Sequence, residues 1–230
     1  MAEMIPMHQL AFDFHGVGTR TVPVRDLVIA GWTGRDRHKV QEHIDELAAI
    51  GVAPPPTVPC FYRAGAALLT TAPEVDCLGA DSSGEVEFIL LMREEGWWVG
   101  AGSDHTDRKV EAHSITVSKQ MCPKPVAPLL WRFEEVAPHW DRLELTAEVD
   151  DCHGFVRYQH GSVAAMRSPH DLVRAYEAGG HRIAPDTLMF GGTLPVTGGI
   201  RPRAAFRFAL HDPVRNQTIR HAYTARWLPG

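Results

Sequence analysis

Three acidic residues have the types and the spacing of a metal site: Glu85 and Glu87 in Ser-Gly-Glu-Val-Glu-Phe, and Asp104 in Gly-Ser-Asp-His-Thr-Asp-Arg. The run from residue 85 to residue 92 predicts a strand, on which alternate side chains share a face. The two glutamates then lie about 7 Å apart on one face. Carboxylates this close repel one another unless a cation neutralises them, and an all-oxygen set suits Mg²⁺, Mn²⁺ or Ca²⁺ better than zinc. The alternative is that these acids are solvated on an exposed strand face, the usual place for glutamate.

A histidine and a glutamate form a second feature with chemical potential. His43 and Glu46 are three residues apart in a segment that predicts a helix over 37–50, so they share one helical face. A carboxylate beside an imidazole fixes its tautomer and stabilises its charged form, which makes the histidine a better base. The alternative interpretation is a surface pair with no chemical role.

Two cations follow the acids along the chain. Arg108 has the planar guanidinium that holds a carboxylate with two parallel hydrogen bonds, and Lys119 offers a compact positive charge against a developing enolate. Either cation can instead form a salt bridge with the neighbouring acids. Lys124, between two prolines, is predicted to be a structural or surface residue. Gln159 and Thr193 lie beside turns, where such polar residues are ordinarily turn formers.

The elements that must position these residues are mostly strands. The pattern predicts a second helix over 169–178, with Ser168 as its N-cap, Pro169 in its first turn and Gly179 at its end. Strands are predicted near 86–92, 97–101, 142–149, 155–159, 187–191, 204–210 and 218–227. Few helices among many strands indicate a β-rich α+β fold. Since no segment reads as a linker, we expect a single domain over 1–230, with the strand segment 1–30 packed on it.

Composition narrows the class of protein. The chain has 230 residues, of which 44% are hydrophobic and 22% charged, and its net charge of −5 comes without a basic stripe. We therefore expect no nucleic-acid or membrane partner. The sequence has no apolar run near the ~20 residues of a membrane span and no signal-peptide pattern, so a cytoplasmic protein is expected. Four widely spaced cysteines predict reduced thiols, none of them a nucleophile: Cys60, Cys77, Cys122 and Cys152.

The ordered series of these motifs resembles the fumarylacetoacetate hydrolase-like family. The resemblance covers about residues 30 to 210. It rests on blocks that occur in family order: Gly34-Arg35-Asp36 with His43-Ile44-Asp45-Glu46, Glu85-Val86-Glu87, Asp104-His105-Thr106-Asp107-Arg108, Lys119, Tyr158-Gln159-His160-Gly161-Ser162 with Met166, and Gly191-Gly192-Thr193-Leu194-Pro195. More narrowly, the segments 103–108 and 118–125 look like the DUF2848 branch.

The resemblance implies a fold, a site and a reaction class. The fold is a twisted, mixed β-roll, and homodimers are usual in the family. The implied roles are metal binding by Glu85, Glu87 and Asp104, catalysis by His43, Glu46 and Lys119, and substrate contact by Arg108, Gln159 and Thr193. The ion is Mg²⁺ or Mn²⁺, with Ca²⁺ as an alternative.

The implied substrate is a small 2-oxo acid or β-dicarbonyl acid, which reacts through a metal-stabilised enolate. Hydrolysis of a carbon–carbon bond is the first expectation. Decarboxylation, hydration, tautomerisation and non-catalytic ligand binding on the same scaffold remain alternatives. The chain departs from the family pattern around the expected pocket, with Ser103 at a usual Asn position and Tyr62-Arg63 within a usual Phe-x-Lys-Pro stretch. These departures favour an unusual substrate over a lost metal.

Overall fold

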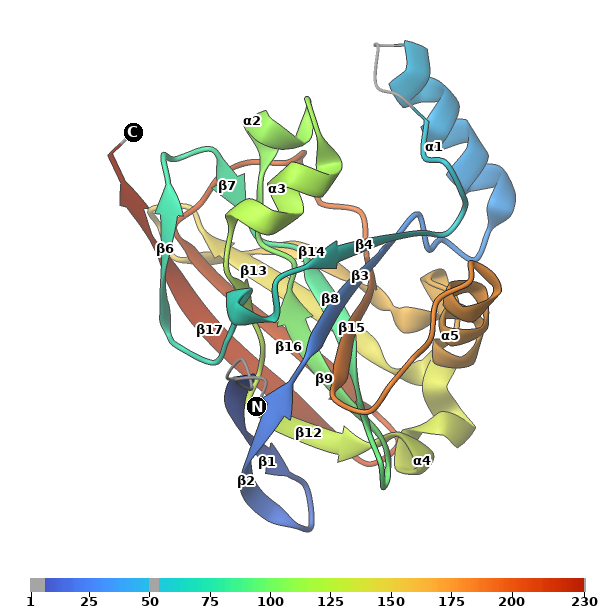
Figure 1. Ribbon diagram of the computed structural model, residues 1–230. Coiled ribbons are helices and arrows are strands. Elements are labelled where there is room, and N and C mark those ends of the chain that lie inside the picture. Colours follow the sequence, from blue (N-terminus) through green and yellow to red (C-terminus); the bar gives the residue numbers. More distant parts are fainter. Residues whose placement is uncertain (1–6, 50–53, 230) are drawn as a thin grey trace, which may run out of the picture.

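Two β-sheets make up most of the molecule in the computed structural model, which describes residues 7–49 and 54–229 (Figure 1). The strands are β1 (His8–Phe14), β2 (Gly18–Val24), β3 (Asp26–Gly31), β4 (Cys60–Ala64), β5 (Leu69–Thr70), β6 (Glu74–Leu78), β7 (Ser82–Ser83), β8 (Val86–Arg93), β9 (Gly96–Ser103), β10 (Thr106–Asp107), β11 (Lys124–Pro125), β12 (Leu129–Arg132), β13 (Glu144–Asp150), β14 (Phe155–Ser162), β15 (Thr187–Thr193), β16 (Ala205–Asp212) and β17 (Gln217–Leu228). The helices are α1 (Arg37–Ala49), α2 (Arg108–Glu111), α3 (Ile115–Met121), α4 (Phe133–Val136) and α5 (Pro169–Ala178). The larger sheet has the order β2-β1-β12-β9-β8-β15-β3-β4, and the smaller has the order β14-β13-β16-β17-β6.

The alternation of side chains along β8 divides the interior into two cores. Val86, Phe88 and Leu90 pack in the first core, between the two sheets, together with side chains of β13, β16 and β17. Ile89 and Leu91 point to the opposite face of the larger sheet and join the second core. Because side chains two residues apart share a face, an acid at position 87 belongs to the side of the second core.

The larger sheet curls around that second core. Phe12 from β1 and Tyr62 from β4 belong to the same buried cluster, although their strands lie near opposite edges of the sheet. Strands this far apart in a flat sheet would not share one core, since neighbouring strands are about 4.8 Å apart. The result is a β-rich α+β roll, and this part of the prediction is confirmed.

Two predicted helices are confirmed, and three others were missed. In α5, the Ser168 side chain accepts a hydrogen bond from the Asp171 N–H, Pro169 opens the helix and Gly179 is the C-cap. The predicted first helix is α1, and its expected last position, residue 50, lies outside the described residues. The short helices α2, α3 and α4 were not predicted, because seven residues or fewer carry too little periodicity to identify a helix.

The first helix projects from the body of the molecule (Figure 1). Of its described side chains, Ile44 is the buried one and Val40 is half-buried.

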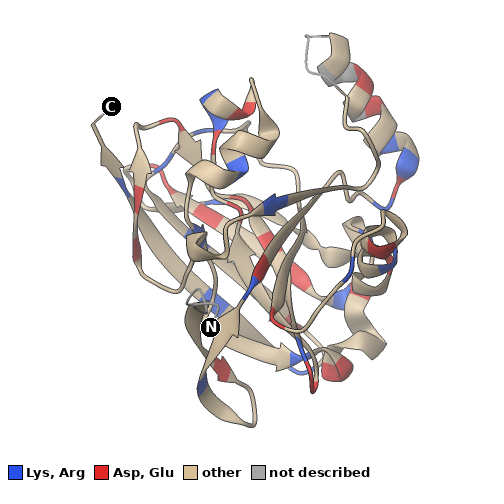
Figure 2. Ribbon diagram, in the orientation of Figure 1, with Lys and Arg blue, Asp and Glu red and all other residues tan. Residues whose placement is uncertain are grey.

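Lys and Arg are scattered among Asp and Glu over the elements seen in Figure 2. Within 7–49 and 54–229, no helix is both long and apolar enough to cross a membrane. All four cysteines are free, three of them buried and Cys152 exposed.

Candidate metal centre

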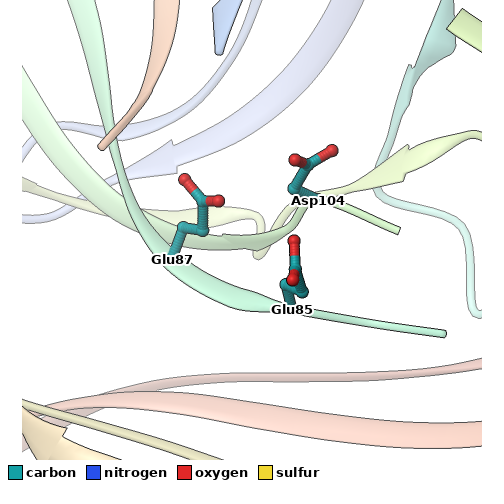
Figure 3. A group of neighbouring side chains, drawn as sticks. All are labelled: Glu85, Glu87 and Asp104. Carbon is teal, nitrogen blue, oxygen red and sulfur yellow. The ribbon is translucent and has the colours of Figure 1, made fainter. Parts of the chain in front are cut away.

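Three carboxylates meet where β8 begins and β9 ends. Each of Glu85, Glu87 and Asp104 has an oxygen within 4.8 Å of those of the other two, and Figure 3 shows the three groups on one side of β8. The pairing of β8 with β9 brings them together, because the Asp104 N–H donates to the Glu85 carbonyl at 3.0 Å. The structure thus unites the three acids that the sequence singled out.

Glu87 is held in a dry environment with only one described hydrogen bond to its carboxylate. Its side chain is 3% exposed, and Oε2 accepts from the Gly192 N–H at 2.6 Å. Burial raises the pKa of Glu87 well above its ordinary value, and the charges of Asp104 and Glu85 raise it further, against the opposing effect of Lys119. An additional cation would relieve this cost of ionisation.

Asp104 is buried between two lysines. Its Oδ2 lies 2.6 Å from the Lys119 ammonium, and its Oδ1 lies 2.8 Å from that of Lys124. Burial alone would raise the pKa of Asp104, but the charges of the two lysines outweigh it and lower the pKa below its usual range. Burial likewise opposes the charge on Lys119, but the surrounding carboxylates outweigh it and raise the pKa of that amine.

Lys124 also belongs to the site, although the sequence did not predict this. Its side chain is fully buried, and its ammonium also donates to the His105 carbonyl at 2.6 Å. No spacing rule marks such a lysine in the sequence, and only its burial beside Asp104 reveals the role. The His105 ring is fixed as well, with Nδ1 2.8 Å from the Tyr223 hydroxyl and Nε2 2.9 Å from that of Ser82.

Arg108 is occupied by carboxylates of the chain itself. Its guanidinium lies 3.1 Å from Glu85 and 2.7 Å from Glu111, and its Nε donates to the Ser83 hydroxyl at 2.7 Å. Burial would lower the pKa of Arg108, but the two carboxylates more than offset this and raise it. Lys119 lies 3.4 Å from the same Glu111. The structure therefore contains the salt bridges that were the alternative for both cations, and their contact with substrate stays a prediction.

The cluster as a whole contains four carboxylates and three cations. They come from one stretch of the chain, residues 85–124: Glu85, Glu87, Asp104, Glu111, Arg108, Lys119 and Lys124. Asp107 caps α2 by accepting from the Val110 N–H. A divalent ion would change the net charge of this set from negative to positive, so an anionic ligand would suit it.

Gln159 and Thr193 tie the start of β8 to the end of β15. The Gln159 side chain is buried, accepts from the Val86 N–H at 2.9 Å and donates to the Thr193 hydroxyl at 2.8 Å. Thr193 donates in turn to the Val86 carbonyl at 2.8 Å. Both residues are thus next to the acidic cluster. Their described hydrogen bonds are internal to the chain, and contact with substrate stays a prediction for them.

The predicted catalytic pair is on α1. His43 and Glu46 fall within that helix, but their side chains lie outside the described part of the structure. Their role as a base and its orienting carboxylate therefore remains a prediction.

The residues present fit a hard divalent cation. The donor set consists of oxygens, which is the set that Mg²⁺, Mn²⁺ and Ca²⁺ prefer. Asp104 Oδ2 is buried, and no described group donates a hydrogen bond to it in good geometry. The Lys119 ammonium approaches this oxygen and lies 3.6 Å from Glu85 Oε2, so it would share two of the three carboxylates with a bound ion.

Comparison with known proteins supports a relationship in both sequence and fold. A family model described as "Protein of unknown function (DUF2848)" matches residues 30–223. Among curated proteins, no sequence matches the chain. Similar solved structures include a candidate fumarylpyruvate hydrolase from Burkholderia cenocepacia (TM-score 0.67, 17% identity, 100% of each chain covered) and a yeast fumarylacetoacetate hydrolase family protein (0.62, 15%, 90% of this chain and 95% of that chain). Another is 5-carboxymethyl-2-hydroxymuconate delta-isomerase from Mycobacterium smegmatis (0.60, 12%, 91% of this chain and 86% of that chain). At these identities, the likeness establishes a shared fold.

Proposed function

The chain belongs to the DUF2848 family and has the fold of fumarylacetoacetate hydrolase-like proteins, and from this and the acidic cluster we propose that it is a divalent-metal-dependent enzyme. The proposed substrate is a small 2-oxo acid or β-dicarbonyl acid, and the proposed reaction is hydrolysis of a carbon–carbon bond. The observation that carries the proposal is the convergence of three carboxylates, within 4.8 Å of one another, at a largely buried position.

Glu85, Glu87 and Asp104 would hold Mg²⁺ or Mn²⁺. When bound, the ion would supply Lewis-acid stabilisation of negative charge on substrate oxygens. The chain's own contribution is to fix these carboxylates. The Gly192 N–H orients Glu87 from one side, and the two lysines orient Asp104 from the other. Such fixed donors need little reorganisation during the reaction.

The remaining residues would bind the substrate and move protons. The ammonium of Lys119 lies beside two of the proposed ligands, where it can balance negative charge that develops on the substrate. His43, oriented by Glu46, is the proposed base that activates water or moves a proton. Arg108, Gln159 and Thr193 are proposed to position the substrate. The similar folds include a hydrolase and an isomerase, so tautomerisation, decarboxylation or hydration on this site would be variants of one chemistry.

Titration calorimetry of metal-stripped protein with Mg²⁺ and Mn²⁺ tests the metal site. We expect one ion per chain in the wild type, bound more tightly with oxalate present, and no binding in Glu85→Ala/Glu87→Ala. The matched control is Glu74→Ala/Asp76→Ala, which removes two acids at the same spacing from the exposed side of β6 and should bind as the wild type does. Equal binding in all three proteins, or none in the wild type, would contradict the proposal.

Turnover tests the enzyme. A panel of 2-oxo and β-dicarbonyl acids is presented to the Mn²⁺-loaded protein, and we expect His43→Ala to lose turnover while its ion binding is retained. A variant with unchanged turnover would remove His43 from the mechanism.

We further propose a cytoplasmic homodimer, for which sedimentation velocity should give twice the mass of the 25.5 kDa chain.

A further inference from the structure

Two aromatic side chains lie on the same face of the larger sheet as the acidic cluster. Tyr62, Ile29, Phe190 and Ile89 are paired in register across β4, β3, β15 and β8, and all four belong to the second core. Glu87 is two residues from Ile89 along β8, so its side chain leaves the sheet on that same side. Tyr62 is therefore on the same side of the larger sheet as Glu87, one row away along the strands and three strands across the sheet.

Tyr62 packs against the end of β3. Its ring covers Gly31, where a Cβ would lie 2.9 Å from the ring edge, and so it is held against β3. Burial raises the pKa of the Tyr62 phenol to about 12, and the charge of Lys119 acts against that rise. The helix that carries Lys119, α3, packs against β4, the strand that carries Tyr62.

Trp32 completes the pair from the end of β3. Its indole Nε1 donates to the Tyr62 hydroxyl at 3.4 Å, and the side chain is half-buried. The next residue, Thr33, packs so closely on Gly192 that a Cβ there would lie 1.8 Å from its hydroxyl. Gly192 is the residue whose N–H holds Glu87. Trp32 is therefore the sequence neighbour of Thr33, which packs on the glycine whose N–H orients the proposed ligand Glu87.

The backbone of Trp32 is strained. Its φ of 58° lies in the left-handed region, which a bulky side chain rarely adopts and which glycine adopts freely. Strained residues persist where the surrounding structure imposes them, and they cluster at functional sites. A glycine would fit this position without strain, yet the chain carries its largest side chain there.

We propose that Trp32 and Tyr62 form an aromatic wall of the substrate pocket and select a 2-oxo acid whose carbon chain bears a planar, conjugated or aromatic group. This inference rests on the proposed function, because it places the chelating end of the substrate at Glu85, Glu87 and Asp104. Aromatic side chains bind flat carbon groups by stacked or edge-on contacts. Arg108, Lys119 and Lys124 are paired with carboxylates of the chain, so the wall distinguishes substrates by shape and apolar contact.

Three probes separate the wall from the metal site: oxalate, which has only the chelating end; pyruvate, which adds a methyl group; and phenylpyruvate, which adds a benzyl group. Each is titrated calorimetrically into the full-length, Mg²⁺-loaded protein. We expect the wild type to bind phenylpyruvate about tenfold more tightly than pyruvate, the factor that stacked aromatic contacts typically supply.

The decisive variant is Trp32→Gly, which removes the indole and relieves the backbone strain. We expect its preference for phenylpyruvate over pyruvate to fall to less than about twofold, with oxalate bound as in the wild type. Tyr62→Phe keeps the ring and should keep the preference, whereas Tyr62→Leu should lose it. The Tyr62 pair decides the matter if Trp32→Gly does not fold.

The outcomes distinguish the two proposals. If the wild type binds oxalate but does not prefer phenylpyruvate over pyruvate, the aromatic wall is overturned and the metal site stays intact. The same conclusion follows if the preference for phenylpyruvate survives in Trp32→Gly and Tyr62→Leu. Failure of oxalate to bind the Mg²⁺-loaded wild type would overturn the proposed function and the wall together.

Discussion

Replacing Lys124 by methionine removes one of the two ammonium groups beside Asp104 while keeping a side chain of similar length. In the wild type, this ammonium lies 2.8 Å from Asp104 Oδ1 and donates to the His105 carbonyl at 2.6 Å. Both Lys124 and Asp104 are buried, so water cannot take the place of the lost contacts. The variant therefore leaves a buried carboxylate with a single lysine as its counter-charge.

The size of the effect follows from this geometry. Removal of one partner from a buried ion pair typically costs about 3–5 kcal/mol, because the other charge stays buried. Since Lys119 still lies 2.6 Å from Asp104 Oδ2, we expect the lower end, about 3 kcal/mol less free energy of unfolding. For a chain of this length, that corresponds to a fall in Tm of roughly 6–12 °C.

Urea unfolding of metal-free protein, with and without Mg²⁺, measures the effect. Lys109→Met on the exposed side of α2 is the matched control, and it should change stability by no more than about 0.5 kcal/mol. Because Lys124→Met removes a positive charge from the cluster, Mg²⁺ should stabilise the variant more than the wild type. If Lys124→Met lost less than about 1 kcal/mol of unfolding free energy, and so could not be told apart from the control, the conclusion that Lys124 holds Asp104 would be refuted.

Three further changes test other parts of the molecule. Gly192→Ala should lower the free energy of unfolding by more than about 2 kcal/mol, because its φ of 98° is unfavourable for alanine and the added Cβ would lie 1.8 Å from the hydroxyl of Thr33. The control is Gly180→Ala, which has a φ of 82° but open space around the added Cβ. In urea unfolding, the control should cost only about 1 kcal/mol. Gln159→Leu should cost about 2–4 kcal/mol, since it removes the side-chain partner of the Val86 N–H and of the Leu194 carbonyl, and circular dichroism during urea titration would show it. Asp212→Asn tests pH dependence: burial would raise the pKa of Asp212, but hydrogen bonds from His139 and backbone N–H groups lower it. Ionised Asp212 therefore stabilises the fold at pH values above its unfolded-state pKa of about 3.9, and this stabilisation is lost as the pH falls through its folded-state pKa. The difference in unfolding free energy between wild type and variant should be largest near pH 7 and shrink below about pH 4. A difference that is constant with pH would contradict this assignment.

The sequence predicted those parts of the fold that depend on periodicity and local caps. α5 begins and ends at the predicted residues because Ser168, Pro169 and Gly179 each act on the helix locally. The strand β8 was predicted by its apolar run, and its alternation correctly placed Glu85 and Glu87 on one face. Sheet order could not be derived in the same way, because pairings such as that of β3 with β15 join residues far apart in the chain.

The sequence predicted the three acids of the candidate metal centre but only some of its cations. Glu85, Glu87 and Asp104 could be recognised because carboxylates at close spacing conflict with one another. Lys124 could not, since a lysine between two prolines gives no sign of burial in the sequence alone. The folded chain brings β11 next to the end of β9, and this makes Lys124 an ion-pair partner of Asp104.

The charged residues of the acidic cluster all belong to the stretch 85–124, whereas Tyr62 belongs to β4 and Trp32 to the segment that follows β3. Ion chemistry and the proposed choice of substrate are thus encoded in separate lengths of the chain. Mutations can accumulate in the earlier segment without changing a single carboxylate of the later one. A lineage built in this way can acquire new substrates step by step while each intermediate still binds its ion, and the same division offers a protein engineer a defined region to randomise.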